Sequence, residues 1–339
     1  MQKIKKLEAP WRITFDTNPD ICNLNCIMCD THSIYNPKRS YARKNMNIDI
    51  VEKVVASVYT HLEEIIPSTM GEPLLYPDFP KLIEIAKKYN VKINLTTNGT
   101  FPFIGVEKWA KMLMPVVSDI KVSINGANKD TVESIMIGID FKKQIENIKT
   151  LIKYRDKVKV EGINNPTITF QVTFMKRNLY EIPKLLELAI KLRVDRFKGH
   201  HLWVTWEQLK EEDLRSNKEL INKWNNIVDE LFKIKEKYKS NIKLDNIFKI
   251  GDESNIYNED IICPFLGKEA WIDWDGTFNI CCAPDNLRKQ FGYFGNVIKD
   301  DFLSLWNSEK YNYFINNWEN NPICRMCNMK RPRSEVKYE

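Results

Sequence analysis

The stretch ICNLNCIMCD, residues 21–30, places Cys22, Cys26 and Cys29 within eight positions near the start of the sequence. No cysteine follows until Cys263, and the remaining four lie beyond it. This uneven distribution indicates two separate cysteine sites, one at each end. In a reducing compartment, clustered cysteines bind metal or take part in chemistry more often than they form disulfides.

The composition favours such a compartment and excludes several classes of partner. The charged start MQKIKKLEAP has no apolar segment behind it, so we expect no signal peptide, and no apolar run is long enough to span a membrane. The net charge of +6 comes from lysines interleaved with acidic residues, and no basic cluster alternates with aromatic residues. We predict a cytoplasmic protein with no membrane or nucleic-acid partner.

Short strand-like runs alternate with amphipathic helical runs between residues 11 and 204, a pattern typical of a parallel α/β sheet. Three of the strands, residues 91–98, 120–125 and 167–174, carry apolar side chains on one face and polar side chains on the other. A filled eight-stranded barrel would carry branched apolar residues inside. The pattern therefore predicts a partial (β/α)6 barrel with helices outside and a wide polar lumen. The predicted strands are residues 11–17, 63–69, 91–99, 119–126, 167–174 and 196–204.

The rest of the sequence divides into two further parts. We predict a barrel at 1–206, a helical bridge with one long helix at 207–262, and a small cysteine-rich domain at 263–339. The last part contains the turn signals WDG, APDN and FGN, together with five cysteines.

Three cysteines at this spacing do not complete a structural zinc site, which requires four ligands. His32 is the only nearby candidate for a fourth. A 4Fe-4S cluster is also usually held by four thiolates. If three cysteines hold such a cluster, one iron stays open to an outside ligand, and the arrangement is reactive.

At this point the sequence resembles the radical S-adenosylmethionine (SAM) enzymes, whose signature is Cys-x3-Cys-x2-Cys after a first strand. The resemblance implies that SAM chelates the open iron. It also implies contacts to SAM from the segment TMGEP, in which Met70 replaces a common glycine, and from the polar ends of later strands. The implied SAM-binding residues are Met28, Gly71, Glu72, Pro73, Asn98, Ser123, Asn125 and Met175.

The second cysteine set consists of Cys263, Cys281 and the Cys324-x2-Cys327 pair, which on chemistry alone suits zinc or a fully ligated 4Fe-4S cluster. The segment resembles the SPASM/Twitch extension of radical SAM enzymes, and the absence of cysteines after Cys327 favours the shorter Twitch form. That resemblance implies one auxiliary 4Fe-4S cluster on these four cysteines. Cys282 is left over as a small buried residue, an alternative ligand or a hydrogen-atom donor.

The resemblance implies reductive cleavage of SAM to a 5'-deoxyadenosyl radical that abstracts a substrate hydrogen, with a low-potential donor such as flavodoxin or ferredoxin. A fully ligated auxiliary cluster suits acceptance of the second electron, so we predict a two-electron dehydrogenation. The predicted lumen, with Asn94, Lys121, Thr169, Gln171 and Lys198, suits a small polar substrate such as a sugar, cyclitol or amino sugar. The candidate catalytic residues are His200, His201, Cys282 and Asp285, with Asp273 and Asp275 as further polar groups near the auxiliary site. Strand alternation allows only one of the two histidines to face inward.

Two other reactions and one non-enzymatic role stay open. Cys282 as a hydrogen-atom donor would make the protein an epimerase. Maturation of a peptide is less favoured, because only ten residues precede the first predicted strand and many peptide-modifying relatives carry a leader-binding module there. A role as an iron-sulfur scaffold or electron carrier would not need the SAM motifs.

Overall fold

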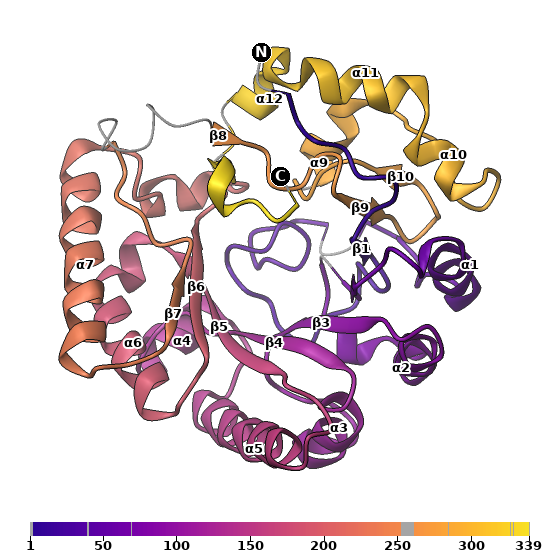
Figure 1. Cartoon of the computed structure of the whole chain (residues 1–339). Helices are drawn as coiled ribbons and strands as arrows, with labels where there is room; N and C mark the ends of the chain where they lie inside the picture. The colour runs from indigo at the N-terminus through magenta and orange to yellow at the C-terminus, as the bar shows by residue number, and fades with distance from the viewer. Residues whose placement is uncertain are drawn as a thin grey trace.

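The computed structural model describes residues 3–38, 41–68, 70–251, 261–283, 285–325, 327 and 329–338. Its main feature is a nine-stranded sheet with the order β10-β9-β1-β2-β3-β4-β5-β6-β7. All neighbouring pairs from β9 to β7 are parallel, and β10 is antiparallel to β9. The sheet curves into an open barrel with helices on its outer side (Figure 1). A separate two-stranded sheet pairs β8 with β11.

The strand bounds are β1 Arg12–Phe15, β2 Glu64–Ile66, β3 Lys92–Thr97, β4 Val117–Ser123, β5 Thr167–Phe174, β6 Arg196–His201, β7 Lys243–Asp245, β8 Ile261–Ile262, β9 Glu269–Ile272, β10 Phe278–Asn279 and β11 Arg331–Pro332. The helices are α1 Ile48–Val58, α2 Phe79–Lys88, α3 Gly105–Leu113, α4 Lys129–Ile135, α5 Phe141–Val160, α6 Ile182–Lys191, α7 Lys218–Lys237, α9 Asp285–Arg288, α10 Phe302–Trp306, α11 Glu309–Asn317 and α12 Pro322–Arg325.

The six predicted strands are confirmed as β1 to β6, and two more strands join the same sheet. β7 lies in the predicted helical bridge and pairs with β6. β9 lies in the cysteine-rich segment and pairs with β1, with Arg12 opposite Glu269 and Phe15 opposite Ile272. The barrel sheet therefore continues into the C-terminal part of the chain.

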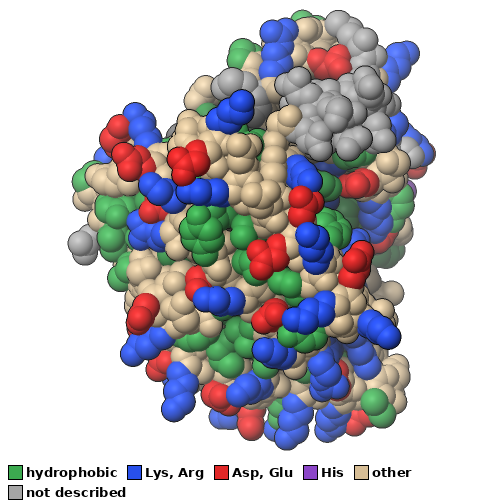
Figure 2. Space-filling model, turned by 90° about the vertical axis from the view of Figure 1, so that its left-hand side faces the viewer, with side chains coloured by type: hydrophobic (Ala, Val, Ile, Leu, Met, Phe, Trp, Pro, Cys, Tyr) green, Lys and Arg blue, Asp and Glu red, His purple; other side chains and the backbone are tan. Residues whose placement is uncertain are grey.

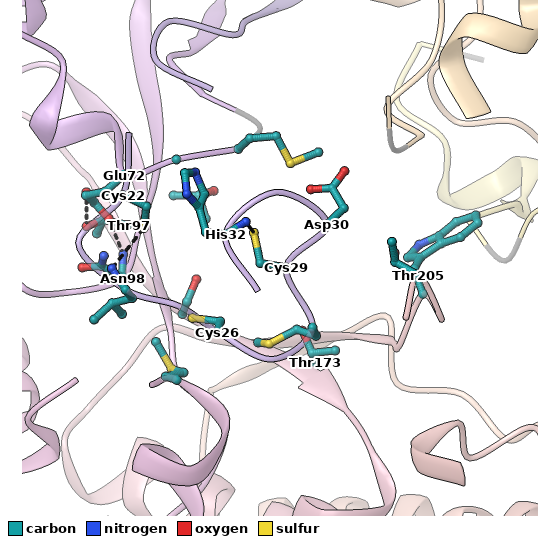
Figure 3. Close-up of a pocket in the computed structure, with 18 of the residues that line it drawn as sticks. Cys22, Cys26, Cys29, Asp30, His32, Glu72, Thr97, Asn98, Thr173 and Thr205 are labelled. Carbon is teal, nitrogen blue, oxygen red and sulfur yellow. Dashed lines mark hydrogen bonds between the residues drawn. The ribbon is translucent and has the colours of Figure 1, made fainter. Parts of the chain in front are cut away.

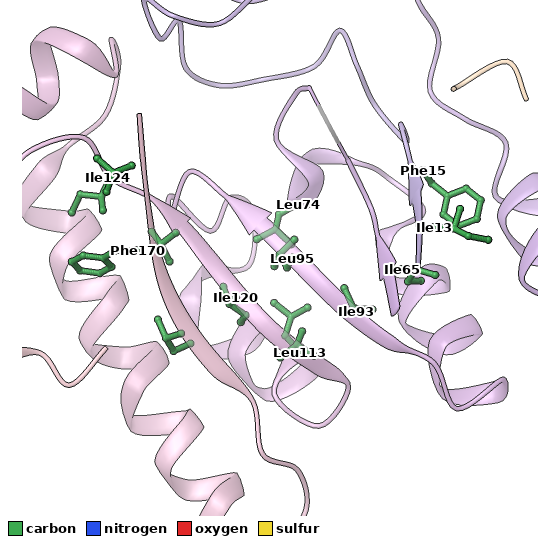
Figure 4. Close-up of a cluster of buried hydrophobic side chains, with 14 of the residues drawn as sticks. Ile13, Phe15, Ile65, Leu74, Ile93, Leu95, Leu113, Ile120, Ile124 and Phe170 are labelled. Carbon is green, nitrogen blue, oxygen red and sulfur yellow. The ribbon is translucent and has the colours of Figure 1, made fainter. Parts of the chain in front are cut away.

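Local sequence signals explain where the long helices begin. Asp140 and Asn217 cap α5 and α7, and each side chain accepts a hydrogen bond from a backbone N–H in the first turn. The apolar strand faces then pack against the helices. Ile93, Ile120 and Phe170 are fully buried in this layer (Figure 4).

The polar faces enclose an open cavity only toward the carboxyl ends of the strands, where Thr96, Ser123 and Thr173 line it, and not along the whole predicted lumen. Near the beginnings of the strands, ion pairs link Arg12 to Glu64 (3.2 Å) and to Glu269 (2.5 Å). Others link Asp245 to Lys198 (3.5 Å) and to Arg331 (3.3 Å). Further members of this buried network are Asn94, Lys121, Asp119, Thr169 and Arg196. The charged side chains of this network are therefore paired with one another, although, within the described part of the chain, the Nε atoms of Arg12 and Arg331 are buried without a hydrogen-bond partner.

The outer surface is mixed in charge. On the face shown in Figure 2, lysine and arginine side chains are interspersed with acidic ones, as in a solvated surface. Among the described residues, no helix combines the length and the apolar character needed to cross a membrane.

Candidate functional site

The three clustered cysteines lie on the loop that follows β1. Leu24 and Ile27 are almost fully buried and anchor this loop in the core. The backbone N–H groups of Asn25 and Ile27 donate to the carbonyl oxygens of Ile137 and Ile135, just beyond and at the end of α4. The loop is thus fixed between anchors, and Cys22, Cys26 and Cys29 all line one cavity of about 320 Å³ (Figure 3).

The end of the loop is braced by a buried arginine. The guanidinium of Arg43 pairs with Asp20 at 2.7 Å and donates to the hydroxyl of Thr31 at 2.8 Å. His32 is the residue that the sequence offers as a possible fourth ligand. Its Nε2 lies 3.0 Å from the carbonyl oxygen of Pro19. His32 lines the same cavity.

The opposite wall of the cavity is formed by the segment after β2 and by the ends of β3 and β4. Gly71 has a φ of +61°, and a Cβ there would lie 2.3 Å from the carbonyl oxygen of Asn18. A glycine is therefore required at this close approach of two backbones. Asn98 and Ser123 line the same cavity, so the structure brings four predicted SAM residues, Gly71, Glu72, Asn98 and Ser123, together with Met28.

Glu72 is the one deeply buried carboxylate on this wall. It accepts hydrogen bonds from the N–H of Asn98 (2.7 Å) and the hydroxyl of Thr97 (2.7 Å). Burial nevertheless raises the pKa of Glu72 to about 7. An ammonium group placed beside this carboxylate would favour its charged form, so the site fits the amino group of SAM.

The donor chemistry of the loop fits an iron-sulfur cluster. Burial raises the pKa of Cys22 to about 12 and that of Cys29 to about 11, and it also raises the pKa of Cys26. Such thiols stay protonated until a metal replaces the proton. Among the described residues, no three Cys, His, Asp or Glu side chains are placed to hold a single metal ion.

The second cysteine set surrounds a second cavity of about 310 Å³. Cys263 follows β8, Cys281 follows β10, and Cys324 and Cys327 lie in and after α12. All four thiols line this cavity, as predicted for one auxiliary site. Its remaining wall is mostly apolar and includes Phe265, Phe291, Trp318, Ile323 and Met329.

Cys282 lines the second cavity beside Cys281. A hydrogen bond between the two thiols lowers the pKa of Cys281 and raises that of Cys282. Both thiols face the second cavity, so the assignment of Cys281 to the cluster stays a prediction.

Three side chains, Met70, His200 and Trp203, line both cavities. His200 is uncharged, because burial lowers its pKa to about 4. Its Nδ1 lies 3.1 Å from the side-chain amide nitrogen of Gln171, a donor, so the hydrogen of the neutral ring lies on Nε2, which is 3.4 Å from the hydroxyl of Thr173. His200 is therefore a hydrogen-bond donor in the wall that the two cavities share.

His201 points to the opposite side of β6. Its ring packs edge-on against Trp224 with centroids 4.9 Å apart, and it lines neither cavity. The structure therefore does not bring His201 to either cavity, unlike His200. Strand alternation explains the difference, because neighbouring residues of a strand face opposite ways.

Several other predicted residues lie outside the two cavities. Pro73, Asn125 and Met175 line neither one. Asn125 instead accepts a hydrogen bond from the N–H of Thr173 (2.8 Å) and ties the ends of β4 and β5 together. Asp273 pairs with Arg288 at 3.5 Å. Asp275 accepts from the N–H of Thr277 (3.0 Å) in a turn.

Asp285 begins α9, and its side chain lies outside the part of the chain that the structure describes. In contrast, none of the predicted site residues lies in the segment after β6, whose tryptophans suit stacking on a sugar or core packing equally well. Trp203 and Thr205 line the first cavity, and the indole N–H of Trp206 donates to the carbonyl oxygen of Cys29 at 2.8 Å. The run LWVTW carries no spacing that would have marked it as part of the site.

Comparison with known proteins agrees with this geometry. Residues 19–189, about half of the chain, match the radical SAM superfamily. The chain belongs to the radical SAM superfamily. Residues 263–328 match the SPASM iron-sulfur cluster-binding domain. The protein is therefore a radical SAM enzyme that binds SAM and a 4Fe-4S cluster, and its SPASM domain binds auxiliary iron-sulfur clusters. That the domain has the shorter Twitch form stays a prediction.

Among curated relatives, the tungsten-containing aldehyde ferredoxin oxidoreductase cofactor-modifying protein of Pyrococcus furiosus is 26% identical over 91% of this chain and 85% of its own length. Mycofactocin maturase MftC of Mycolicibacterium smegmatis is 23% identical over 58% of this chain and 48% of its own. The fold of this radical SAM enzyme is also seen in solved structures. Streptococcus suis SuiB bound to S-adenosylmethionine has a TM-score of 0.68 at 14% identity, over 96% of this chain and 72% of that one. Native anSMEcpe with bound AdoMet has a TM-score of 0.66 at 17% identity, over 95% of this chain and 89% of that one.

Proposed function

We propose that this radical SAM enzyme removes two hydrogen equivalents from a substrate carbon held at the shared wall of the two cavities. The observation that carries the proposal is that Met70, His200 and Trp203 line both cavities. A substrate group at this wall therefore touches the side chains that separate the two cysteine sites. When bound, SAM and the two clusters would supply two things: a 5'-deoxyadenosyl radical, which takes a hydrogen atom from the substrate, and an acceptor for the remaining electron. The substrate proton goes to solvent.

The residues that would hold these groups follow from the cavities. Cys22, Cys26 and Cys29 would bind the first cluster, and Glu72 would bind the amino group of SAM. The remaining set, Cys263, Cys281, Cys324 and Cys327, would bind the auxiliary cluster. His200 would exchange the 3.4 Å contact between its Nε2 and the hydroxyl of Thr173 for a hydrogen bond to a substrate oxygen, and so orient the reacting carbon.

The lining of the second cavity supports a substrate with an apolar group rather than a polyol. The five lumen residues expected to bind hydroxyl groups, which include Lys121 and Gln171, line neither cavity. Lys330 is the one charged side chain among the described residues that line the second cavity. One of its three hydrogens is donated to the carbonyl oxygen of Arg325 (2.9 Å), so the ammonium group can still bind an anionic substrate group.

A peptide or a peptide-derived cofactor precursor offers this combination of apolar side chain and carboxylate. The names of the relatives support this class, since one is a cofactor-modifying protein and another a mycofactocin maturase. SuiB has also been solved with a precursor peptide, SuiA. We therefore favour a peptide-like substrate over the small sugar or cyclitol that the sequence suggests.

Metal analysis and product mass test the reaction. Iron content after anaerobic reconstitution should be about eight per chain and fall to about four in the Cys22/Cys26/Cys29→Ala variant and in the Cys263/Cys324/Cys327→Ala variant. The second variant should still form 5'-deoxyadenosine but give no oxidised product. A product lighter by about two mass units in the wild type supports oxidation.

Epimerisation is the second candidate, because Cys282 lines the second cavity, whose wall includes Met70, His200 and Trp203. A thiol there could return a hydrogen atom to the substrate radical. In deuterated water, an epimerase would give a product of unchanged composition with one solvent deuterium, and Cys282→Ala would abolish the label. That result would replace the oxidation proposal.

A further inference from the structure

The segment that joins β6 to the 3-10 helix Glu207–Glu212 connects the substrate wall to the cysteine loop. It begins at Leu202, whose N–H donates to the carbonyl oxygen of Phe174 and whose carbonyl oxygen accepts from Arg215 at 2.8 Å. It ends at Trp206, which packs partly buried against the core. Between these fixed points, Trp203 lines both cavities.

The contact at the end of the segment is made to the third cysteine itself. The indole N–H of Trp206 donates to the backbone carbonyl oxygen of Cys29 at 2.8 Å, across 177 positions of sequence. The Cys29 N–H is already bonded to the carbonyl oxygen of Cys26, and the Cys29 sulfur accepts from the N–H of His32 at 3.2 Å. Each polar group of Cys29 is therefore oriented by a partner.

We propose that Trp206 is a positioning residue for the cluster held by Cys22, Cys26 and Cys29. Its indole N–H holds the Cys29 peptide in one orientation and reduces the negative charge that the carbonyl oxygen presents to the cluster. Because a ligand's orientation and the local dipoles both tune a bound metal, Trp206 sets the reduction potential and retention of this cluster. The inference rests on the three-cysteine cluster and not on the reaction outcome.

The test compares two tryptophan variants, each of which loses one hydrogen bond from an indole N–H to a backbone carbonyl oxygen. Trp206→Phe keeps a six-membered aromatic ring and removes the indole N–H. Trp109→Phe is the matched control, because the indole of Trp109 donates to the carbonyl oxygen of Pro102 at 2.9 Å, far in sequence from the cysteine loop. In each reconstituted protein, whose auxiliary cluster serves as an internal reference, the rate of iron loss to a chelator and the reduction potential of the SAM-binding cluster are measured.

We expect Trp206→Phe to lose the SAM-binding cluster about fivefold faster than the wild type, the change expected from one ordinary hydrogen bond. Its potential should become more negative, while Trp109→Phe should match the wild type in both measurements. An unchanged potential in Trp206→Phe overturns the proposal, even if iron is lost faster, since that would show a purely structural contact. Equal effects in both variants also overturn it. Failure of the oxidation proposal would not alter either readout.

Discussion

Gly71→Ala should damage the SAM site through backbone geometry alone. The new Cβ would lie 2.3 Å from the carbonyl oxygen of Asn18 and 2.7 Å from that of Ile21, and φ is +61°. Two bonds would be lost or stretched by the necessary shift: Glu72 N–H to Ile21 O (2.9 Å) and Asn18 Nδ2 to Glu72 O (2.7 Å). About 1 kcal/mol for the left-handed backbone and about 1–2 kcal/mol for each bond give a loss of about 3–5 kcal/mol.

Gly162→Ala provides the matched control. Gly162 also has a positive φ, of +69°, but a Cβ there would have no neighbour within 4 Å. It should lose only the backbone contribution of about 1 kcal/mol. For a chain of 339 residues, these values correspond to falls in Tm of about 4–7 °C for Gly71→Ala and about 1–2 °C for Gly162→Ala.

Thermal unfolding of both reconstituted variants measures this difference, and calorimetric titration with SAM measures its consequence for the site. We expect SAM affinity to fall in Gly71→Ala and to stay at the wild-type value in Gly162→Ala. Equal Tm values for the two variants would refute the reasoning, because the close contact at Gly71 would then carry no cost. Unchanged SAM affinity in Gly71→Ala would refute its placement at the SAM site.

Three further predictions concern the buried network and the second cysteine set. Burial lowers the pKa of Lys121 to about 7. Between pH 7 and about 10.5 the unfolded chain therefore binds more protons than the folded chain. The free energy of unfolding should rise with pH across that window, by up to about 1.4 kcal/mol per pH unit. Lys121→Met should flatten this rise in urea titrations, and an unchanged slope would contradict it. Arg12→Gln leaves Glu64 and Glu269 without their shared cation and should lower the free energy of unfolding by about 3–5 kcal/mol in the same assay. As a control, Lys87→Gln removes one partner of the exposed pair with Glu84 and should change the free energy of unfolding by less than about 1 kcal/mol. Iron analysis should show loss of about four irons in Cys281→Ala and none in Cys282→Ala, and the reverse pattern would exchange the two assignments.

The parts of the fold that the sequence predicts are those with local signals. The alternation of apolar and polar residues in strands such as β5 locates the sheet, and the three-cysteine spacing locates the first cluster site. β7 has only three residues and β9 is buried at all four positions, so neither carries an alternating pattern. Their parallel pairings also depend on partners far away in sequence, for which no local pattern exists.

The same limit explains the site residues that the sequence did not supply. Alternation correctly separates His200 from His201 but does not say which one faces the cavity. Met70 belongs to the predicted TMGEP segment, but neither its place in the second cavity nor that of Trp203 follows from spacing, because both residues lie on irregular segments. The predicted polar lumen is open toward the carboxyl ends of the strands and filled toward their beginnings, because a sequence does not show that Lys121 and Asn94 bind each other instead of a ligand.

One strand pairing fixes the relation between the two cysteine sites. β1 ends at Phe15, seven residues before Cys22, while β9 continues through a tight turn into β10, which ends two residues before Cys281. Because β10 runs antiparallel to β9, Cys281 follows a strand that runs back toward the beginning of β9, whereas Cys22 follows the end of β1; both segments are nevertheless anchored to strands of one sheet. Arg12, at the start of β1, bonds to a glutamate on each neighbouring strand and stabilises this register. The positions of the two cysteine segments relative to each other are therefore fixed by strands of one hydrogen-bonded sheet.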